Sequence, residues 1–203
     1  MTSLKQKTLS REREFRGKGL HTGQIATMRL MPAPVGTGIV FRRVDLGQDS
    51  IVKALAGNVS STARSTTISQ GQASVSTIEH IMSALSGMGV DNALIDIDNV
   101  EVPILDGSAR LYVEAIMEDG LVEQDAMKKY VTIPRVIEVR DEKTGSYIKA
   151  TPSDSPSIDL TVDFGSRVLG VQRARWDEDT DYAGQIACCR TFVFFHEIEY
   201  LFQ

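Results

Sequence analysis

The sequence predicts an α+β fold with two domains. Segments with strand-like alternation precede segments with helical periodicity, and this order occurs twice, which favours α+β layers over alternating βαβ units. The 203 residues are 42% hydrophobic, which is enough to bury a core in one large domain or two small ones. A charged, irregular stretch at 120–129 is typical of a linker. We therefore place the domains at 1–124 and 125–203.

Strands dominate the first domain. Alternating apolar residues bounded by turn residues predict strands at 8–15, 26–31, 39–43, 51–59 and 93–97, with a Ser/Thr-rich run after the fourth. A first helix begins near Glu79 and ends near Gly87, because its apolar residues recur at helical spacing. Asp106-Gly107-Ser108 is expected to cap a second helix at 109–118.

The second domain restarts with strands, expected at 130–139, 146–150 and 158–164. A loop at 165–170 and a short helix at 177–186 follow. The closing segment 190–201 is apolar and aromatic and has no terminating signal before Gln203. We therefore expect this chain to be the amino-terminal portion of a longer protein, with an incomplete second domain.

Composition excludes several classes of protein. The net charge is -5 from 27 acidic and 22 basic residues, and no basic run suggests a nucleic-acid partner. We expect no signal peptide and no transmembrane segment, because the basic opening lacks an apolar run and no long apolar stretch follows. Cys188 and Cys189 are adjacent, which suits buried small apolar residues better than a redox pair or an ordinary disulfide. We therefore expect the protein to lie in a reducing, cytoplasmic compartment.

Glu79 and His80 are the most informative pair. A carboxylate beside an imidazole suits metal-assisted hydrolysis, with the carboxylate as base and the imidazole as ligand. Ser76 lies three positions before Glu79, and the same spacing fits a capping box in which both residues bond the backbone of the helix start. His80 then needs no ligand role. The residues alone leave both interpretations open.

Three other groups of residues have chemistry that could serve a site. His21 lies in the turn-like run Gly19-Leu20-His21-Thr22-Gly23, either as a site residue or as a locally bonded histidine. The acidic residues at 91, 96, 98, 101 and 106 lack the spacing of a calcium loop and are expected on a solvated strand face and at a helix cap. Arg190-Thr191-Phe192 could line a site for an anionic or amphiphilic ligand, or form an ordinary strand end.

Four segments in this order carry a family resemblance. They are KTLSREREFRGKGLHTG, PAPVGTGIVFRRVDL, STIEHIMSALSGMGVDNALIDIDNVEVPILDGSA and ACCRTFVFFHEIEYL. Together they closely resemble the UDP-3-O-acyl-N-acetylglucosamine deacetylases, from about residue 5 to the end of the chain. The third segment, which contains Glu79 and His80, is the most specific part.

The resemblance implies a fold and an activity. Each half would be a two-layer sandwich of sheet and helices, with the active site between the two similar halves. The enzyme would be a Zn²⁺-dependent hydrolase that removes the N-acetyl group from UDP-3-O-acyl-N-acetylglucosamine, the committed step of lipid A biosynthesis. The expected partner is this small-molecule substrate, and we expect a cytoplasmic monomer.

Residue roles carry over by position. The resemblance implies that Glu79 is the general base and that His80 is one zinc ligand. Further residues are implied near the substrate: Thr191, Phe192, Thr62, Ser65 and His21. The family takes two more zinc ligands and another catalytic histidine from later segments, and this chain includes none of them. We therefore expect the 203-residue chain to be inactive alone. The alternatives are a non-catalytic module that binds the nucleotide-sugar lipid, and a scaffold domain.

Overall fold

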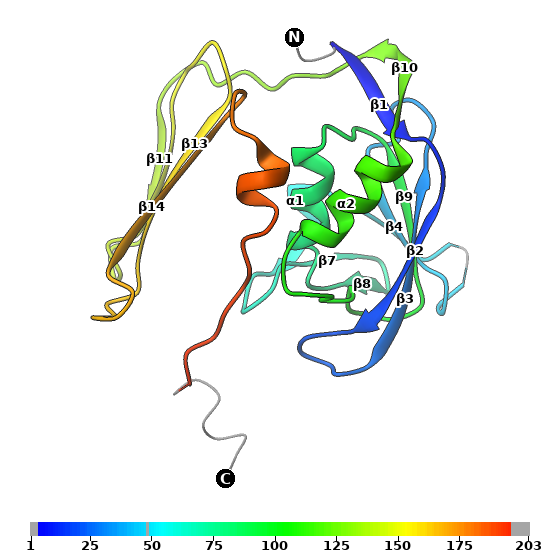
Figure 1. Cartoon of the computed structure of the whole chain (residues 1–203), viewed down its shortest axis with the longest axis horizontal. Helices are drawn as coiled ribbons and strands as arrows, with labels where there is room; N and C mark the ends of the chain where they lie inside the picture. The colour runs from blue at the N-terminus through cyan, green and yellow to red at the C-terminus, as the bar shows by residue number, and fades with distance from the viewer. Residues whose placement is uncertain (1–3, 48, 196–203) are drawn as a thin grey trace. The chain divides into compact units, whose positions relative to one another are not determined.

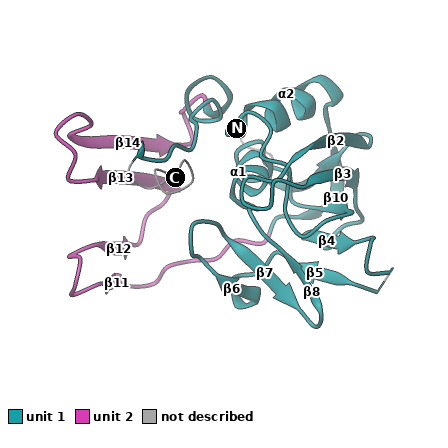
Figure 2. Ribbon diagram, turned by 90° about the horizontal axis from the view of Figure 1, so that it is seen from below, with its two compact units in different colours: residues 1–128, 182–203 teal, residues 129–181 magenta. Residues whose placement is uncertain are grey.

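The computed structural model describes residues 4–47 and 49–195, and these form two compact units. Unit 1 comprises Met1–Lys128 together with Tyr182–Gln203, and unit 2 comprises Lys129–Asp181 (Figure 2). The units differ from the expected domains because the segment that begins at Tyr182 groups with unit 1. The α+β class is confirmed, whereas the division into two similar domains at 124/125 stays a prediction. Residues 196–203 of the expected closing segment lie outside the described part.

A mixed five-stranded sheet is the centre of unit 1, with the strand order β2-β3-β9-β4-β5. Its strands are Arg13–Lys18 (β2), Ile25–Pro32 (β3), Ala93–Ile97 (β9), Ile39–Arg43 (β4) and Ile51–Lys53 (β5). Strand β9 pairs antiparallel with β3 and parallel with β4. The predicted strands at 39–43 and 93–97 are confirmed to the residue.

Two smaller sheets complete unit 1. Lys5–Leu9 (β1) pairs antiparallel with Leu121–Met127 (β10). The other sheet has the order β6-β7-β8, in which Val59–Ser61 (β6) and Ala73–Val75 (β8) flank Thr67–Gln70 (β7). A 3₁₀ turn, Ala56–Asn58 (η1), separates β5 from β6, so the single strand expected at 51–59 is wrong.

Two α-helices cover one face of the central sheet (Figure 1). They are Glu79–Gly87 (α1) and Arg110–Asp119 (α2). Their inward side chains share one core cluster with alternate residues of β3 and β9. A π-helical turn, Tyr182–Ile186 (η2), packs on the helices: the Tyr182 hydroxyl lies 2.6 Å from Ser83 Oγ, and Ala187 is buried in the same core. The Tyr182 ring also fills the space that a side chain at Gly87 would need. These contacts place the segment after residue 181 in unit 1.

Unit 2 consists of two hairpins. Ile137–Arg140 (β11) pairs with Tyr147–Ala150 (β12), and Ser157–Asp163 (β13) pairs with Val171–Asp177 (β14). Its residues 129–181 are all described, and none of them is buried. Among the described residues, no helix has both the length and the apolar character needed to cross a bilayer.

Several predicted elements are wrong for identifiable reasons. The expected linker at 120–129 is mostly β10, whose polar residues hid the strand: Gln124 donates to the Ala33 carbonyl and accepts from buried Asn92. The strand β14 was missed because its sequence, VQRARWD, has no regular apolar alternation, unlike that of its partner β13. The expected strand at 8–15 is interrupted between β1 and β2. Cys188 and Cys189 are exposed, rather than buried as expected.

Candidate active site

Glu79 and His80 form the first turn of α1, and both side chains are half-buried. Glu79 Oε2 accepts the backbone N–H of Thr66 at 3.0 Å, and the Thr66 carbonyl accepts the N–H of Ile78 at 3.4 Å. A carboxylate in the first turn also favours the positive end of the helix dipole. Two hydrogen bonds therefore hold the start of α1 against the loop between β6 and β7.

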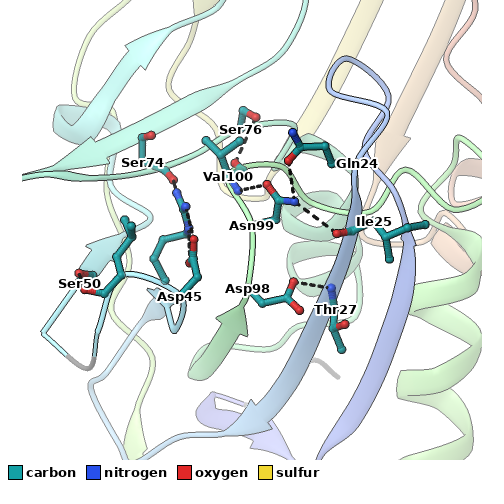
Figure 3. Close-up of polar contacts among 12 residues, drawn as sticks. Gln24, Ile25, Thr27, Asp45, Ser50, Ser74, Ser76, Asp98, Asn99 and Val100 are labelled. Carbon is teal, nitrogen blue, oxygen red and sulfur yellow. Dashed lines mark hydrogen bonds and ion pairs between the residues drawn. The ribbon is translucent and has the colours of Figure 1, made fainter.

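The capping-box interpretation is wrong. The residue that precedes the helix is Ile78, and no side chain caps the helix there. Ser76 Oγ instead donates to the Val100 carbonyl at 3.3 Å (Figure 3). Because Glu79 bonds Thr66 rather than the backbone of the helix start, its carboxylate faces the Ser/Thr-rich loop. Thr62 in this loop is exposed and Ser65 is half-buried. The bond from Thr66 is the contact that joins this loop to the Glu79 carboxylate.

Thr77, which lies two residues before Glu79, has an unusual backbone. Its φ is +58°, although a β-branched residue strongly disfavours that region, and it is only 2% exposed. Arg64 and Leu105 are the other described non-glycine residues with positive φ, at +60° and +51°. Each of the three adjoins a candidate segment: the Ser/Thr-rich loop, the start of α1, and the Asp106 turn. Backbone strain of this kind is typical of functional sites.

Glu101 is a buried carboxylate with several hydrogen-bond donors. Its oxygens accept the His21 N–H at 2.9 Å, the Thr22 N–H at 2.8 Å and the Thr77 hydroxyl at 3.0 Å. The side chain is 1% exposed. Burial alone would raise the pKa of Glu101, but the hydrogen bonds from His21, Thr22 and Thr77 outweigh it and lower the pKa below its ordinary value. This carboxylate therefore stays ionised and joins the His21 turn to Thr77.

The segment that leads into Glu101 is anchored to the sheet (Figure 3). Asn99 Nδ2 donates to the Gln24 side chain at 3.1 Å and to the Ile25 carbonyl at 3.3 Å. Asp98 Oδ1 accepts the Thr27 N–H at 2.7 Å. These contacts lie at the start of β3, directly after the turn that contains His21. Glu101 is thus held beside the His21 turn by its own carboxylate and by the two residues that precede Val100.

The Asp106 turn contacts the segment that contains Thr191. Gly107 accepts the Thr191 N–H at 2.9 Å, and an Asp106 carboxylate oxygen lies 3.5 Å from the Arg190 guanidinium. Burial would raise the pKa of Asp106, but hydrogen bonds from Ser108 and Arg110 lower it overall. Thr191 is exposed, and the Phe192 ring is 56% exposed.

The expected cap of α2 is only partly as predicted. The residue before α2 is Ala109, which makes no side-chain cap bond. Ser108 Oγ instead accepts the Arg110 N–H at 3.1 Å, and Asp106 accepts from Ser108 at 2.8 Å.

The expected zinc ligand His80 has no described partner ligands. Within residues 4–47 and 49–195, no three histidine, cysteine or carboxylate side chains come together as a metal site. His21, which is exposed, contacts Glu101 through its backbone and not as a metal ligand beside His80. The described contacts join Glu79 to the loop of Thr62 and Ser65, His21 to Thr77 through Glu101, and Thr191 to Gly107.

Sequence reasoning missed the roles of two acidic residues. Asp96 and Glu101 were expected on a solvated face, yet they are only 4% and 1% exposed. Arg42 forms two 2.7 Å hydrogen bonds with Asp96. The available signal for Glu101 was its setting in Val100-Glu101-Val102-Pro103, because a lone acid in an apolar run needs hydrogen-bond partners.

Comparison with known proteins identifies similar chains. A family model described as UDP-3-O-acyl N-acetylglycosamine deacetylase matches residues 6–203. The UDP-3-O-acyl-N-acetylglucosamine deacetylase of Saccharophagus degradans is 44% identical over 202 residues, which are 98% of this chain and 66% of that protein. The protein of the same name from Cellvibrio japonicus is 41% identical over 201 residues, again 98% of this chain and 66% of the relative.

A longer relative also matches. The bifunctional enzyme LpxC/FabZ of Porphyromonas gingivalis is 44% identical over 199 residues, which cover 98% of this chain and 43% of that protein. The chain thus spans just under two thirds of the length of the two deacetylases and less than half of the bifunctional relative.

Proposed function

Because the chain belongs to the UDP-3-O-acyl N-acetylglycosamine deacetylase family, we propose that the complete protein is a hydrolase of lipid A biosynthesis. By complete protein we mean a chain that contains these residues and has the length of its relatives. Its reaction is removal of the N-acetyl group from UDP-3-O-acyl-N-acetylglucosamine. Water adds to the acetyl carbonyl, the carbon–nitrogen bond breaks, and acetate and a free amine result.

The place of Glu79 is the single observation that carries this proposal. Its carboxylate lies at the start of α1 beside His80 and faces a loop rather than capping the helix. A half-buried carboxylate in that position can accept a proton from water as the water attacks an amide carbonyl. We assign this general-base role to Glu79. The bond from the Thr66 N–H orients the carboxylate.

The resemblance also implies Zn²⁺ as the cofactor, with His80 as one ligand. A neutral imidazole is a common zinc ligand, but catalytic zinc sites use three protein ligands and an open position. The described residues supply only His80 and so do not complete such a site. We propose that the complete protein provides the remaining ligands. The place of Glu79 beside His80 at the start of α1 supports the role of base that the resemblance implies.

Five residues are proposed to border the substrate: Thr62, Ser65, His21, Thr191 and Phe192. The first two belong to the loop that Glu79 bonds, and Thr191 is tied to the Asp106 turn. The exposed Phe192 ring would suit contact with the acyl chain. We also propose a cytoplasmic location, which the two exposed free thiols fit, and a monomeric state.

The test uses the Glu79→Gln variant of the complete protein. Glutamine can still accept the Thr66 N–H but cannot take a proton from water, so we expect turnover to fall about 10²–10⁴-fold while the fold is kept. Acetate release with purified substrate measures the effect, and circular dichroism checks the fold. Glu118→Gln, which changes an exposed glutamate near the end of α2, is the matched control and should leave turnover unchanged. Undiminished turnover in Glu79→Gln would contradict the assignment.

The alternative function is a non-catalytic module that binds the nucleotide-sugar lipid, and the incomplete ligand set favours it for this chain taken alone. We expect the 203-residue chain, supplied with Zn²⁺, to release no acetate. Binding of the substrate by this chain, unaffected by Glu79→Ala, would favour the module. Acetate release by the chain itself would overturn the expected inactivity.

A further inference from the structure

Glu101 joins the turn that contains His21 to Thr77, and Thr77 leads directly to the proposed base. On one side it accepts two backbone N–H groups of the turn that contains His21. On the other side it accepts the hydroxyl of Thr77. Thr77 is followed by Ile78, whose N–H bonds the Thr66 carbonyl, and then by Glu79. A continuous series of contacts therefore joins the His21 turn to Glu79, the proposed general base.

The arrangement carries two costs that a purely structural contact could avoid. A buried carboxylate loses its hydration, and hydrogen-bond donors must offset that loss. Thr77 is held at φ +58°, a backbone region that a β-branched residue strongly disfavours. The turn also fits closely, because a side chain at Gly19 would collide with the Glu101 carboxylate. The backbone of Thr77 and the turn at Gly19 are thus both adapted to the Glu101 side chain.

The backbone just before Thr77 is fixed by the segment that contains Glu101. Ser76 N–H donates to the Val100 carbonyl at 2.8 Å, and the Val102 N–H donates to the Ser76 carbonyl at 3.1 Å. These two bonds hold the chain up to Ser76, whereas the Thr77 hydroxyl is the contact that acts at the residue where the backbone turns into α1.

We propose that Glu101 is a positioning residue of the active site. It holds Thr77 in its strained conformation and thereby sets where α1 begins and how the side chains of Glu79 and His80 are oriented. Through the same carboxylate it also fixes the position of the His21 turn relative to Glu79 and His80. This inference rests on the proposed function of the Glu79–His80 pair, because it names the residue that orients that pair.

A first experiment uses nuclear magnetic resonance on the 203-residue chain and needs no enzymatic activity. Glu101→Gln replaces one acceptor oxygen with an NH₂ group, which cannot accept the N–H groups of the turn. We expect the Thr66 amide signal and the His80 imidazole signal to shift. The chain has three histidines, so these imidazole signals are readily assigned.

The matched control is Asp96→Asn, which also removes a buried carboxylate but one that pairs with Arg42. It should leave the Thr66 and His80 signals in place. If Glu101→Gln lowers the melting temperature yet moves neither signal, Glu101 is only a stabilising residue and the proposal is overturned.

A second pair of variants decides the question if Glu101→Gln does not fold. Thr77→Val keeps the volume of the side chain and removes the hydroxyl that Glu101 accepts, while Thr77→Ser keeps the hydroxyl. We expect Thr77→Val to reproduce the shifts at Thr66 and His80 and Thr77→Ser to restore the wild-type signals. Equal spectra for the two variants would overturn the proposed route through Thr77.

Kinetics of the complete protein separate positioning from binding. Misplacing a reacting group by about 1 Å can cost about 10²-fold in rate, so Glu101→Gln and Thr77→Val should lower kcat by roughly that factor with little change in KM. Thr77→Ser and Asp96→Asn should retain kcat. A change confined to KM would overturn the positioning role. Absence of acetate release by the wild-type protein would instead overturn the proposed function and leave the spectroscopic result standing.

Discussion

Units 1 and 2 are built from strands of similar length, yet they differ in how the apolar residues of those strands are covered. In unit 1, Met28, Phe41 and Ile95 are completely buried beneath α1 and α2. In unit 2, Val139 and Ile148 are 68% and 80% exposed. Alternation therefore predicts that a segment forms a strand, but burial depends on whether another layer covers the strand's face.

The polar groups of the two units differ in the same way. In unit 1, buried Asn92 donates to Gln6 and Gln124, each at 2.8 Å, and Asp96 pairs with Arg42. The ion pairs of unit 2, such as Arg140–Glu138 at 2.9 Å, join exposed side chains. A buried polar group must be matched by a partner, whereas an exposed one is satisfied by water.

The largest expected difference between the units concerns isoleucine. Ile95→Ala opens a cavity in the core of unit 1 and should lower the free energy of unfolding by about 2–5 kcal/mol. Ile148→Ala removes an exposed side chain and should change it by less than about 0.5 kcal/mol. Urea unfolding can follow each unit separately: circular dichroism reports α1 and α2 of unit 1, and the single tryptophan, Trp176 in β14, reports unit 2. Equal losses of unfolding free energy in the two variants would contradict the difference in burial between the two units.

A smaller difference is expected between the two kinds of ion pair. Asp96→Asn leaves the Arg42 guanidinium without its charged partner and should destabilise unit 1 by about 1–3 kcal/mol. Glu138→Gln breaks an exposed pair and should cost less than about 1 kcal/mol. Thermal unfolding at low and high salt measures both effects, and salt should weaken the exposed pair more. A larger cost for Glu138→Gln would reverse the comparison.

A third expected effect concerns the response of unit 1 to acid. The hydrogen bond from Arg13, with further contributions from Arg11, lowers the pKa of Asp119 to about 2. Because this value lies below that of the unfolded chain, about 3.9, the stabilisation is complete above pH 4 and is lost as the pH falls toward 2. Unit 1 should therefore lose stability over this range, and Asp119→Asn should flatten the dependence. Melting temperatures measured between pH 5 and pH 2 provide the check, and an unchanged slope in the variant would contradict it.

The sequence predicted those parts of the molecule in which one local pattern determines the outcome. The central strands β4 and β9 follow from alternation, and α1 from its apolar spacing and the glycines at its end. The pairing of β1 with β10 could not be predicted, because it joins polar strands from opposite ends of unit 1. For the same reason the segment from Tyr182 could not be assigned to unit 1: the contact of Tyr182 with Ser83 is long-range.

The candidate site likewise contains residues that a local sequence pattern predicts and residues whose role depends on the fold. Glu79 and His80 stand out because they are adjacent at a helix start, and the motifs around them carry the family resemblance. The contribution of Glu101 depends on the fold, since its partners come from the His21 turn and from Thr77. The strain at Thr77 is likewise invisible in the residue type, because threonine ordinarily avoids positive φ.

The pairing of β1 with β10 also has a consequence for synthesis of the chain. Leu9 lies opposite Leu121, so 121 - 9 = 112 residues separate the two partners. At about 5–20 residues per second, a ribosome needs roughly 6–22 seconds to make the second strand after the first. During that time the backbone groups of Lys5–Leu9 that face β10 are hydrogen-bonded to water, and Ala187 reaches the core later still. Strand β1 is thus made before the other described strands of unit 1 but is one of the last to gain its partner.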